Sequence, residues 1–419
     1  MRVLFIHQNF PGQYTHVAKY LVAAGHEVVA LAQRDNAVPE GVRRILYKPQ
    51  RDAARQTHHY LRGAENGVLY GQAVLRACME LHQEGFRPDI VIGHNGWGEI
   101  LFIKDIWPKV PLLGYFEFFY HLRGADTGFD PEFPLVPDDG PRLRIKNTVN
   151  LLGLHAADWG QVPTQWQRRV HPPLYHPTLS VIHEGVDTQA VRPDLLATAT
   201  LPNGTRLNAG DEVITFVSRN LEPYRGFHVF MRTLPEILRR RPQAQVIIVG
   251  ADGVSYGKRL PEGETYLKRM QAEVGDQIDH SRVHILGSLP YVQYLRVLQI
   301  SAVHIYLTYP FVLSWSMLES MSAGCLVIGS ATPPVREVIE DGVNGLLVDF
   351  FDQTGLADRI DHVLDHPTRL AALRLAARQT VIERYDLKTV CLPQYLDLVN
   401  TLAAGGRPGG QGAVPLRKP

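Results

Sequence analysis

Short apolar runs rich in β-branched residues alternate with longer amphipathic stretches through the first half of the chain. Apolar residues recur at helical spacing within 13–24 and 70–81, which predicts two helices with one apolar face each. Alternation of strands with helices is typical of βαβ units and a parallel sheet. The apolar runs predict strands at 2–7, 26–32, 88–94, 111–116 and 159–162.

The same alternation starts again in the second half of the chain, so we expect a second α/β domain of similar design. Between the two series, residues 187–210 carry turn-forming residues without apolar periodicity, which predicts an interdomain connection. Residues 403–419 are rich in glycine and proline and are expected to form a disordered tail. The second series predicts strands at 212–218, 245–250, 282–287, 302–307, 325–329 and 345–349.

Composition excludes several classes of protein. With 45% hydrophobic and 20% charged residues among 419, the chain has globular proportions, which excludes an intrinsically disordered protein. A net charge of +1 gives no global attraction to nucleic acid or anionic lipid. Three cysteines far apart in the sequence form neither a disulfide framework nor a metal-binding pattern, which favours a reducing compartment. No apolar run reaches the roughly 18 residues that a spanning helix needs. We therefore expect a cytoplasmic protein, at most peripherally attached to the inner face of the membrane.

A glycine follows the first predicted strand, in the turn that leads to the first helix. Gly12 would let backbone amides approach a phosphate at the helix amino terminus. An ordinary tight turn explains the same residue. The Gly-x-Gly-x-x-Gly spacing of dinucleotide-binding proteins is absent here, which disfavours NAD binding.

Two arginines follow the first strand of the second domain, six residues apart. Arg219 and Arg225 lie beyond the carboxyl end of that strand, where ligands of open α/β sheets bind. Two guanidinium groups suit a diphosphate leaving group, although surface arginines are often only solvated. The run Arg239–Arg241 closes a predicted helix and is expected to be solvated.

The segment 309–325 predicts a loop that opens a helix, with a single carboxylate, Glu319, in the first turns of that helix. A carboxylate at this place can accept both hydroxyls of a ribose, or simply compensate the helix dipole. Histidines are scattered, and no Asp-x-Asp triplet occurs, so we expect no metal site. Gly-x-Ser-x-Gly and the Walker phosphate loop are also absent, which disfavours a serine hydrolase and a P-loop kinase.

The segment Val181–Thr188, with sequence VIHEGVDT, is followed by Arg192-Pro193 and resembles the interdomain motif of retaining glycosyltransferase family 4, the group 1 glycosyltransferases. Further segments continue the resemblance in order over most of the chain, at 282–287, 302–307, 318–324, 327–330 and 337–347. The resemblance implies the GT-B fold, with two Rossmann-like, doubly wound domains facing across a cleft. It places the acceptor on a first domain, 1–190, and the nucleotide sugar on a second, 191–385, with helix 386–402 crossing back to the first.

The resemblance also assigns roles to residues of the second domain. Arg219 and Arg225 match the pair that holds the donor diphosphate and assists its departure, and Glu319 matches the ribose-binding carboxylate. Phe311 stands where the family has a glutamate that contacts the donor sugar, so sugar selection is expected to differ. The remaining donor-site residues implied by the resemblance are Leu289, Leu313 and Ser314.

In the first domain, the resemblance implies three further site residues. Gly12 matches the flexible loop on the phosphate side. Glu117 follows the fourth predicted strand, where the family often has a histidine near the reacting carbon. Its carboxylate could act as an acid or base, bind the acceptor, or be structural. His94, in the run His94–Glu99, would line the acceptor side.

The resemblance therefore implies a retaining glycosyltransferase that uses a UDP or GDP sugar, a saccharide or lipid-linked acceptor, and neither metal nor cofactor. The alternatives are a GT-B sugar-nucleotide epimerase, a phosphorylase, or a sugar-nucleotide-binding protein without catalysis. No nucleic-acid partner is expected.

Overall fold

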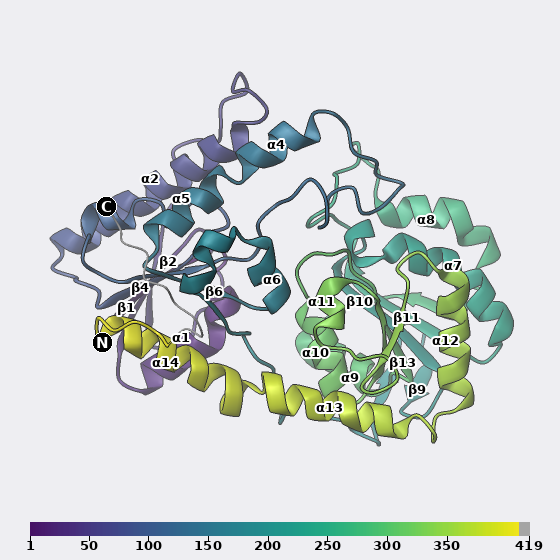
Figure 1. The fold of residues 1–419 in the computed structure, drawn as a ribbon. Coiled ribbons are helices and arrows are strands. Elements are labelled where there is room, and N and C mark those ends of the chain that lie inside the picture. Colours follow the sequence, from purple (N-terminus) through teal and green to yellow (C-terminus); the bar gives the residue numbers. More distant parts are fainter. Residues whose placement is uncertain (410–419) are drawn as a thin grey trace. The chain divides into compact units, whose positions relative to one another are not determined.

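A computed structural model describes residues 1–409, and these residues divide into two compact units. Unit 1 comprises Met1–Gly185 and the chain from Lys388 onward, whereas unit 2 comprises Val186–Leu387. The sequence places these boundaries at 190/191 and 385/386. Both units are shown in Figure 1.

Unit 1 is built on a seven-stranded sheet in which every neighbouring pair is parallel, in the order β3-β2-β1-β4-β5-β6-β7. Five of these strands are predicted by the sequence. The edge strands β3 and β7 are not, because β3 is only half-buried and contains two arginines, and β7 is three residues long. The strands are β1 (Arg2–Ile6), β2 (Glu27–Ala32), β3 (Val42–Leu46), β4 (Ile90–His94), β5 (Leu112–Tyr115), β6 (Trp159–Val162) and β7 (Leu179–Val181).

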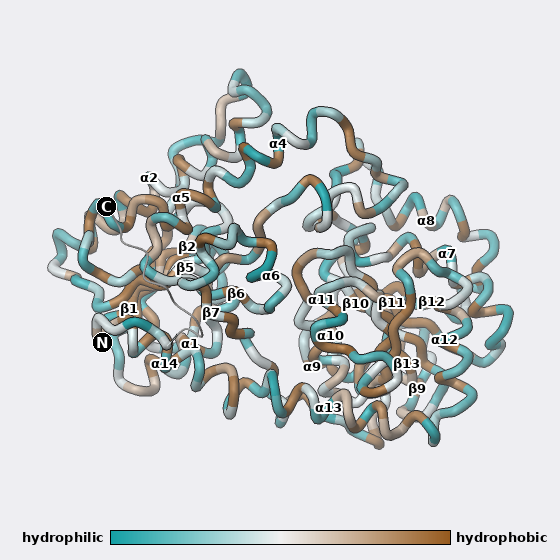
Figure 2. The backbone as a smooth tube through the Cα atoms, viewed as in Figure 1, coloured by the Kyte–Doolittle hydropathy of each residue, from teal (hydrophilic) through white to brown (hydrophobic). Residues whose placement is uncertain are grey.

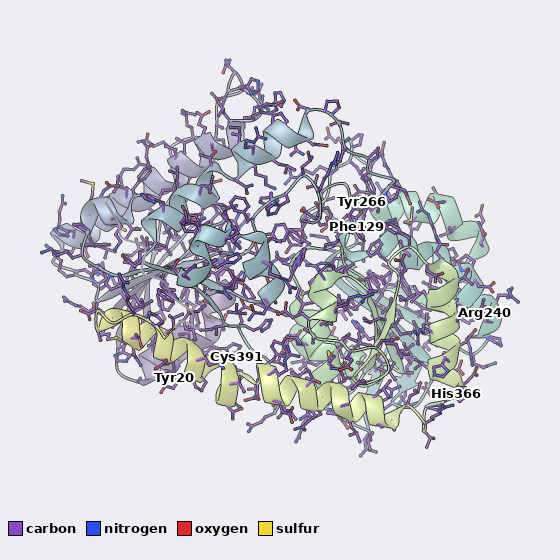
Figure 3. All side chains as sticks on the ribbon, viewed as in Figure 1. Tyr20, Phe129, Arg240, Tyr266, His366 and Cys391 are labelled. Carbon is purple, nitrogen blue, oxygen red and sulfur yellow. The ribbon has the colours of Figure 1, made fainter. Side chains whose placement is uncertain are left out.

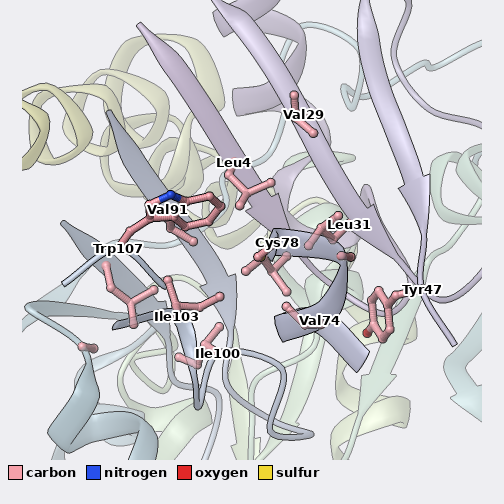
Figure 4. Close-up of a cluster of buried hydrophobic side chains, with 14 of the residues drawn as sticks. Leu4, Val29, Leu31, Tyr47, Val74, Cys78, Val91, Ile100, Ile103 and Trp107 are labelled. Carbon is pink, nitrogen blue, oxygen red and sulfur yellow. The ribbon is translucent and has the colours of Figure 1, made fainter. Parts of the chain in front are cut away.

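Helices cover both faces of this sheet. Successive residues of a strand point to opposite faces, so Leu4 packs in one apolar cluster and Phe5 in another. Figure 4 shows part of the first cluster, which includes Val74 and Cys78 of α2 and Leu4, Val29 and Val91 of the strands. The helical elements are η1 (Gly12–Tyr14), α1 (Thr15–Ala23), α2 (Arg62–Gln83), α3 (Ile103–Ile106), α4 (Asp139–Lys146), α5 (Thr148–Ala156), α6 (Gln165–Val170), η2 (Pro173–Thr178) and α14 (Leu392–Ala403).

The second apolar cluster contains α14, which comes from the carboxyl end of the chain. Tyr395, Leu398 and Val399 of α14 pack with residues of α1 and with the face of the sheet that includes Phe5. A π-helical turn, Leu387–Cys391, precedes this helix. Ala403 ends α14, and residues 410–419 of the expected disordered tail lie outside the described part of the chain.

Unit 2 is built on a six-stranded parallel sheet in the order β12-β11-β10-β13-β14-β15. All six strands were expected from the sequence, with ends that differ by a few residues. As in unit 1, the strands are predominantly hydrophobic in Figure 2 because helices cover both faces. The strands are β10 (Val213–Asn220), β11 (Gln245–Ala251), β12 (Val283–Ile285), β13 (Val303–Tyr306), β14 (Leu326–Ser330) and β15 (Leu346–Val348).

The two faces of this sheet pack against different helices. Phe216 of β10 stacks on Phe230 of α7 with ring centroids 5.0 Å apart. Its neighbour Val217 contacts the opposite cluster, which draws on α9, α10 and α13. The helical elements are η3 (Pro223–Arg225), α7 (Phe227–Arg240), α8 (Tyr266–Val274), η4 (Gly275–Gln277), α9 (Tyr291–Gln299), α10 (Trp315–Ser322), α11 (Pro333–Arg336), α12 (Gln353–Asp365) and α13 (Ala371–Tyr385).

The expectation that 187–210 is only an interdomain connection is wrong. This segment lies within unit 2 and contains an antiparallel hairpin, β8 (Thr198–Thr200) and β9 (Arg206–Asn208). Leu201 and Leu207 pack with Ile247 of the sheet. The hairpin escaped prediction because each strand is three residues long and offers too few positions to show alternation.

The expectation that Arg239–Arg241 is simply solvated is also wrong for part of the run. Arg240, labelled in Figure 3, bonds to Asp358 and Asp361 of α12. Arg241 pairs with Asp361 and Asp365, and its side chain is only 14% exposed. The carboxylates lie more than a hundred positions later in the sequence, so no local pattern could reveal them.

Among residues 1–409, no helix combines the length and apolar character that crossing a membrane requires.

Packing of α14 predicts a measurable effect on unit 1. Leu398 is 3% exposed, so Leu398→Ala should lower the free energy of unfolding of unit 1 by about 2 to 5 kcal/mol, through lost burial and a cavity. The matched control is Leu375→Ala on α13, where the side chain is 72% exposed and a change within about 0.5 kcal/mol is expected. Denaturant unfolding checks both variants, and equal effects would contradict the packing of α14.

Candidate active site

Residues with candidate chemistry in unit 2 gather on the loops that follow β10, β11 and β13, which are adjacent strands of the sheet. Carboxyl ends of adjacent parallel strands meet at one edge, and open α/β sheets bind ligands there. Arg219 is the penultimate residue of β10, Arg225 ends η3, and Phe311 lies between β13 and α10.

Arg225 is a buried guanidinium that ties two of these loops together. Its Nη1 donates to Thr308 Oγ1 at 2.8 Å and to the Val312 carbonyl at 2.9 Å, and lies 3.4 Å from Tyr306 Oη. Nε and Nη2 make no hydrogen bond within the described part of the chain. Arg225 is therefore held in one orientation with donors left for an anionic ligand.

Gly226 explains why the chain can turn sharply after Arg225. Its φ is +68°, and a Cβ at this position would lie 2.3 Å from Leu307 Cβ. Only glycine tolerates both the left-handed conformation and this approach. The turn also begins α7 directly after the arginine.

Arg219 differs from Arg225 in being exposed. It lies where the register between β10 and β11 shifts, between Val217 and Asn220. Its guanidinium makes no hydrogen bond or ion pair to any of residues 1–409. The two arginines thus combine a fixed, buried group with a free, exposed one.

Glu319 lies on α10, half-buried, with both carboxylate oxygens already in use. Tyr291 donates to Oε1 and Tyr294 donates to Oε2, each at 2.7 Å. Burial, followed by the Glu319 charge, raises the pKa of both tyrosine hydroxyls, so they remain donors. Each carboxylate oxygen can accept a second hydrogen bond, so ribose hydroxyls could still bind. The spacing of Tyr291 and Tyr294 places both tyrosines on one face of α9. No pattern in the sequence indicates that they bind Glu319.

Phe311 is buried in an aromatic cluster of unit 2. Its ring lies 4.9 Å from Tyr256 and 5.4 Å from Tyr224, in both cases edge to face. Aromatic rings, rather than a carboxylate, therefore surround the position where the sequence expects sugar contact.

Leu289, Leu313 and Ser314 take structural roles in unit 2. Leu313 belongs to the apolar cluster under α10, and Leu289 packs against it. Ser314 caps α10, since its Oγ accepts from the Ser316 amide at 3.4 Å, and its own amide donates to Tyr306 Oη at 2.7 Å. Their expected contacts with a donor stay a prediction.

In unit 1, Gly12 opens η1 at the carboxyl end of β1, with φ +45°. A Cβ here would lie 2.8 Å from Cε1 of His7. His7 Nδ1 accepts from the Asn9 amide at 2.9 Å, and its Nε2 pairs with Gln13 Oε1 at 2.8 Å. Burial lowers the pKa of His7 to about 4, so the ring is neutral and Nε2 is the donor.

His94 ends β4 and is 1% exposed. Its ring is stacked with Trp97 at 4.4 Å and Tyr115 at 5.1 Å, and meets His7 edge to face. Nδ1 accepts from the Gly96 amide at 2.9 Å, so the proton of the neutral ring is on Nε2. That N–H has no partner among residues 1–409. Burial also lowers the pKa of His94, which keeps the ring neutral.

Glu117 follows β5, which the sequence numbers as the fourth strand because β3 is not predicted. The backbone around it is firmly held by amide side chains. Gln167 Nε2 donates to the Glu117 carbonyl at 2.7 Å, and Asn150 Nδ2 donates to the Phe118 carbonyl at 3.1 Å. The half-buried carboxylate therefore lies on a fixed loop at the same sheet edge as His94.

Two carboxylates are more deeply buried than the sequence indicates. Glu99 ends the run His94–Glu99, which the resemblance places on the acceptor side. Burial raises the pKa of Glu99 to about 7, and its Oε1 accepts from Tyr47 Oη at 3.0 Å. Glu222, for which the sequence predicts no role, is 1% exposed and binds three consecutive backbone amides.

Residues 24–191 match the model of the glycosyl transferase family 4 group, and residues 199–380 match that of glycosyl transferases group 1. The chain belongs to the group 1 glycosyltransferases. The family predicted from the motifs between 181 and 347 is thereby confirmed.

Curated relatives of this glycosyltransferase have low sequence identity to it. D-inositol 3-phosphate glycosyltransferase of Mycolicibacterium smegmatis is 26% identical over 71% of this chain and 63% of its own length. A GDP-mannose-dependent phosphatidylinositol monomannoside mannosyltransferase of the same organism is 24% identical over 49% of this chain and 52% of its own. Glycogen synthase of Mycobacterium tuberculosis is 24% identical over 93% and 92%. The chain thus spans less than two thirds of the first two relatives.

Solved structures show the same fold. Sucrose-phosphate synthase of Thermosynechococcus elongatus matches with a TM-score of 0.71 and 18% identity, over 97% of this chain and 100% of that one. Anabaena HepE in complex with UDP and glucose matches with a TM-score of 0.68 and 16% identity, over 96% and 100%. The expected fold class, α/β with two Rossmann-like GT-B domains, is confirmed.

Burial of His7 predicts a pH dependence of stability. Its pKa is about 4 when folded and about 6.5 when unfolded, so the unfolded chain binds the proton more tightly. The free energy of unfolding should therefore fall as the pH drops below 7, and His7 alone should contribute about 2 kcal/mol between pH 7 and pH 5. Denaturant unfolding at both values checks this in the wild type, in His7→Asn and in the exposed control His155→Gln. The slope should flatten in His7→Asn only, and an unchanged slope would contradict the assignment.

Proposed function

We propose that this chain is a retaining glycosyltransferase that transfers a sugar from a UDP or GDP sugar to a saccharide or lipid-linked acceptor. The observation that carries the proposal is the pair Arg219 and Arg225, one free and one fixed, at the ligand-binding edge of unit 2. The names of relatives support both nucleotides, since HepE is described with UDP-glucose and the mannosyltransferase as GDP-mannose-dependent.

The donor would bind to unit 2. Arg225 offers Nε and Nη2 to the diphosphate from a fixed position, and Arg219 closes on the same group from solvent. As the bond to the sugar breaks, negative charge grows on the leaving phosphate, and fixed guanidinium donors stabilise that charge. Glu319, held by its two tyrosines, accepts the ribose hydroxyls.

We propose that the reaction needs neither a metal nor a cofactor. The two arginines supply the positive charge that a divalent cation would otherwise bring to the diphosphate. Full activity in EDTA is therefore expected, and activity restored specifically by magnesium or manganese would overturn this part of the proposal.

The acceptor would bind to unit 1. His94, whose buried Nε2–H has no partner among residues 1–409, ends β4, and Glu117 lies on the loop after the neighbouring strand β5. Gly12, in the turn after β1, would let backbone amides approach a phosphate. In a retaining transfer the leaving phosphate takes the acceptor proton on the same face, so Glu117 would orient the acceptor or stabilise positive charge at the sugar carbon.

A second candidate is a sugar-nucleotide-binding protein without catalysis. The burial of Phe311 among aromatic rings favours it, because a phenyl ring accepts no hydrogen bond from a sugar hydroxyl.

One assay separates these functions. The purified chain is incubated with UDP and GDP sugars, saccharide and lipid acceptors, and EDTA, and the anomeric coupling constant of any product is measured by NMR. Transfer with the donor's configuration supports the proposal. An inverted product refutes the retaining mechanism, and tight nucleotide binding without turnover favours the second candidate. Formation of an epimerised sugar nucleotide without an acceptor would instead indicate an epimerase, and dependence on inorganic phosphate would indicate a phosphorylase.

Arg219 provides a clean test of the donor site. Arg219→Ala should weaken donor binding or transfer by roughly ten- to hundredfold, because it removes a charge-assisted contact worth about 1.5 to 3 kcal/mol. The fold should persist, since Arg219 has no partner in the described part of the chain. Arg225→Ala is less informative, because it would also strip Thr308 and Val312 of their donor. Arg239→Ala, on a side chain 70% exposed, serves as the control and should bind donor normally.

Glu117 should govern transfer rather than donor binding. Glu117→Gln keeps the size of the side chain but removes its charge, so turnover should fall by roughly tenfold or more with little change in donor affinity. Steady-state kinetics and nucleotide titration measure the two effects separately. The control is Glu84→Gln, on an exposed side chain of unit 1. Unchanged turnover in Glu117→Gln would assign the residue a structural role.

A further inference from the structure

Glu222 is a buried carboxylate at the candidate donor site. It follows β10, lies three residues before Arg225, and is 1% exposed. Oε1 accepts from the Ser255 amide at 3.0 Å, and Oε2 accepts from the amides of Tyr256 at 3.1 Å and Gly257 at 2.8 Å. Three consecutive amides thus surround one anion, in the manner of a backbone anion nest.

No cation within residues 1–409 lies in salt-bridge range of this carboxylate, so the backbone amides are the donors that satisfy it. Burying an ionised carboxylate is costly unless hydrogen bonds satisfy it. Satisfying it here requires the loop of residues 252–258 to hold one conformation. Asn220 supports the same conformation, because its Nδ2 donates to Ser255 Oγ at 2.5 Å.

The loop that Glu222 binds includes Tyr256, whose ring lies beside Arg225 and Phe311. The Tyr256 ring centroid lies 5.4 Å from Cζ of Arg225 and 4.9 Å from the ring centroid of Phe311. A cation near an aromatic face and an edge-to-face ring pair both have preferred geometries. Disorder of the loop would therefore remove one neighbour of each of these residues.

We propose that Glu222 is a positioning residue for the donor. Its carboxylate orders the amides of 255–257, holds Tyr256 against Arg225 and Phe311, and so keeps the diphosphate-binding guanidinium aligned. It contacts no substrate itself, and acts through the loop. This inference rests on the proposed donor site in unit 2.

The test measures affinity rather than stability. UDP and GDP are titrated calorimetrically into the full chain, and the nucleotide that the wild type binds is used for the variants. Glu222→Gln replaces one accepting oxygen with an NH₂ group that faces a backbone N–H, so Kd should rise about tenfold, equivalent to about 1.4 kcal/mol. Glu222→Asp keeps the charge and should recover part of the affinity.

A matched control separates positioning from simple stabilisation. Thr265 is the last residue of the same β11–α8 connection. Its side chain caps α8 by accepting from the Lys268 amide at 3.1 Å. Thr265→Ala should lower stability while the Kd of the folded protein stays that of the wild type. A Kd in Glu222→Gln within twofold of the wild type would overturn the inference.

A milder variant keeps the test valid if Glu222→Gln fails to fold. A Cβ on Gly257 would lie 3.1 Å from Glu222 Oε2, close enough to displace the carboxylate by a few tenths of an ångström. Gly257→Ala should therefore raise Kd by a few fold, whereas Gly275→Ala, with no atom within 4 Å of the new Cβ, should not. Equal Kd values in the two variants would overturn the inference. A wild type that binds neither nucleotide would instead refute the proposed donor site, and this inference with it.

Discussion

Both sheets of this protein are parallel, and each is covered by helices on both faces. The middle of a parallel strand buried on both faces has no side chain free for a ligand, so chemistry is confined to the strand ends and the loops that follow them. In unit 1, His94 ends a strand, and Gly12 and Glu117 lie on loops that follow strands; in unit 2, Arg219 lies at the end of β10 and Arg225 just beyond it. The geometry of every candidate group therefore depends on how firmly its loop is held.

The two units hold their loops by different chemistry. In unit 1, neutral side-chain amides hold a loop in place, since Gln167 and Asn150 donate to the backbone carbonyls of Glu117 and Phe118. In unit 2, buried charged side chains hold the loops in place, since Arg225 binds the loop after β13 and Glu222 binds the loop after β11. Charge-assisted bonds are stronger and more demanding in geometry than neutral ones, which suits a site expected to bind a diphosphate.

The sequence predicted the fold class, the family and most of the strands, because apolar periodicity and motif order are local properties. It failed where the deciding partner is distant or the element too short. The strands of the β8–β9 hairpin are each three residues long. The carboxylate partners of Arg241 lie on α12, far along the sequence. Tyr291 and Tyr294 of α9 bind Glu319, which lies 28 and 25 positions later. Glu222 was missed for the same reason, since its amide partners are more than thirty positions away. The roles of the site residues stay predictions.

The return of α14 to unit 1 has a consequence for how the protein is made. Unit 2 is contiguous in sequence, whereas the core of unit 1 joins residues near Phe5 to residues near Leu398. On a ribosome, the amino-terminal sheet must wait, with one apolar face covered by α1 but not yet by α14, until the whole of unit 2 has been synthesised. Contacts separated by so much chain form slowly, and exposed apolar surface favours aggregation in the meantime. Helix α14 thus completes the core of unit 1 only after unit 2 has been synthesised.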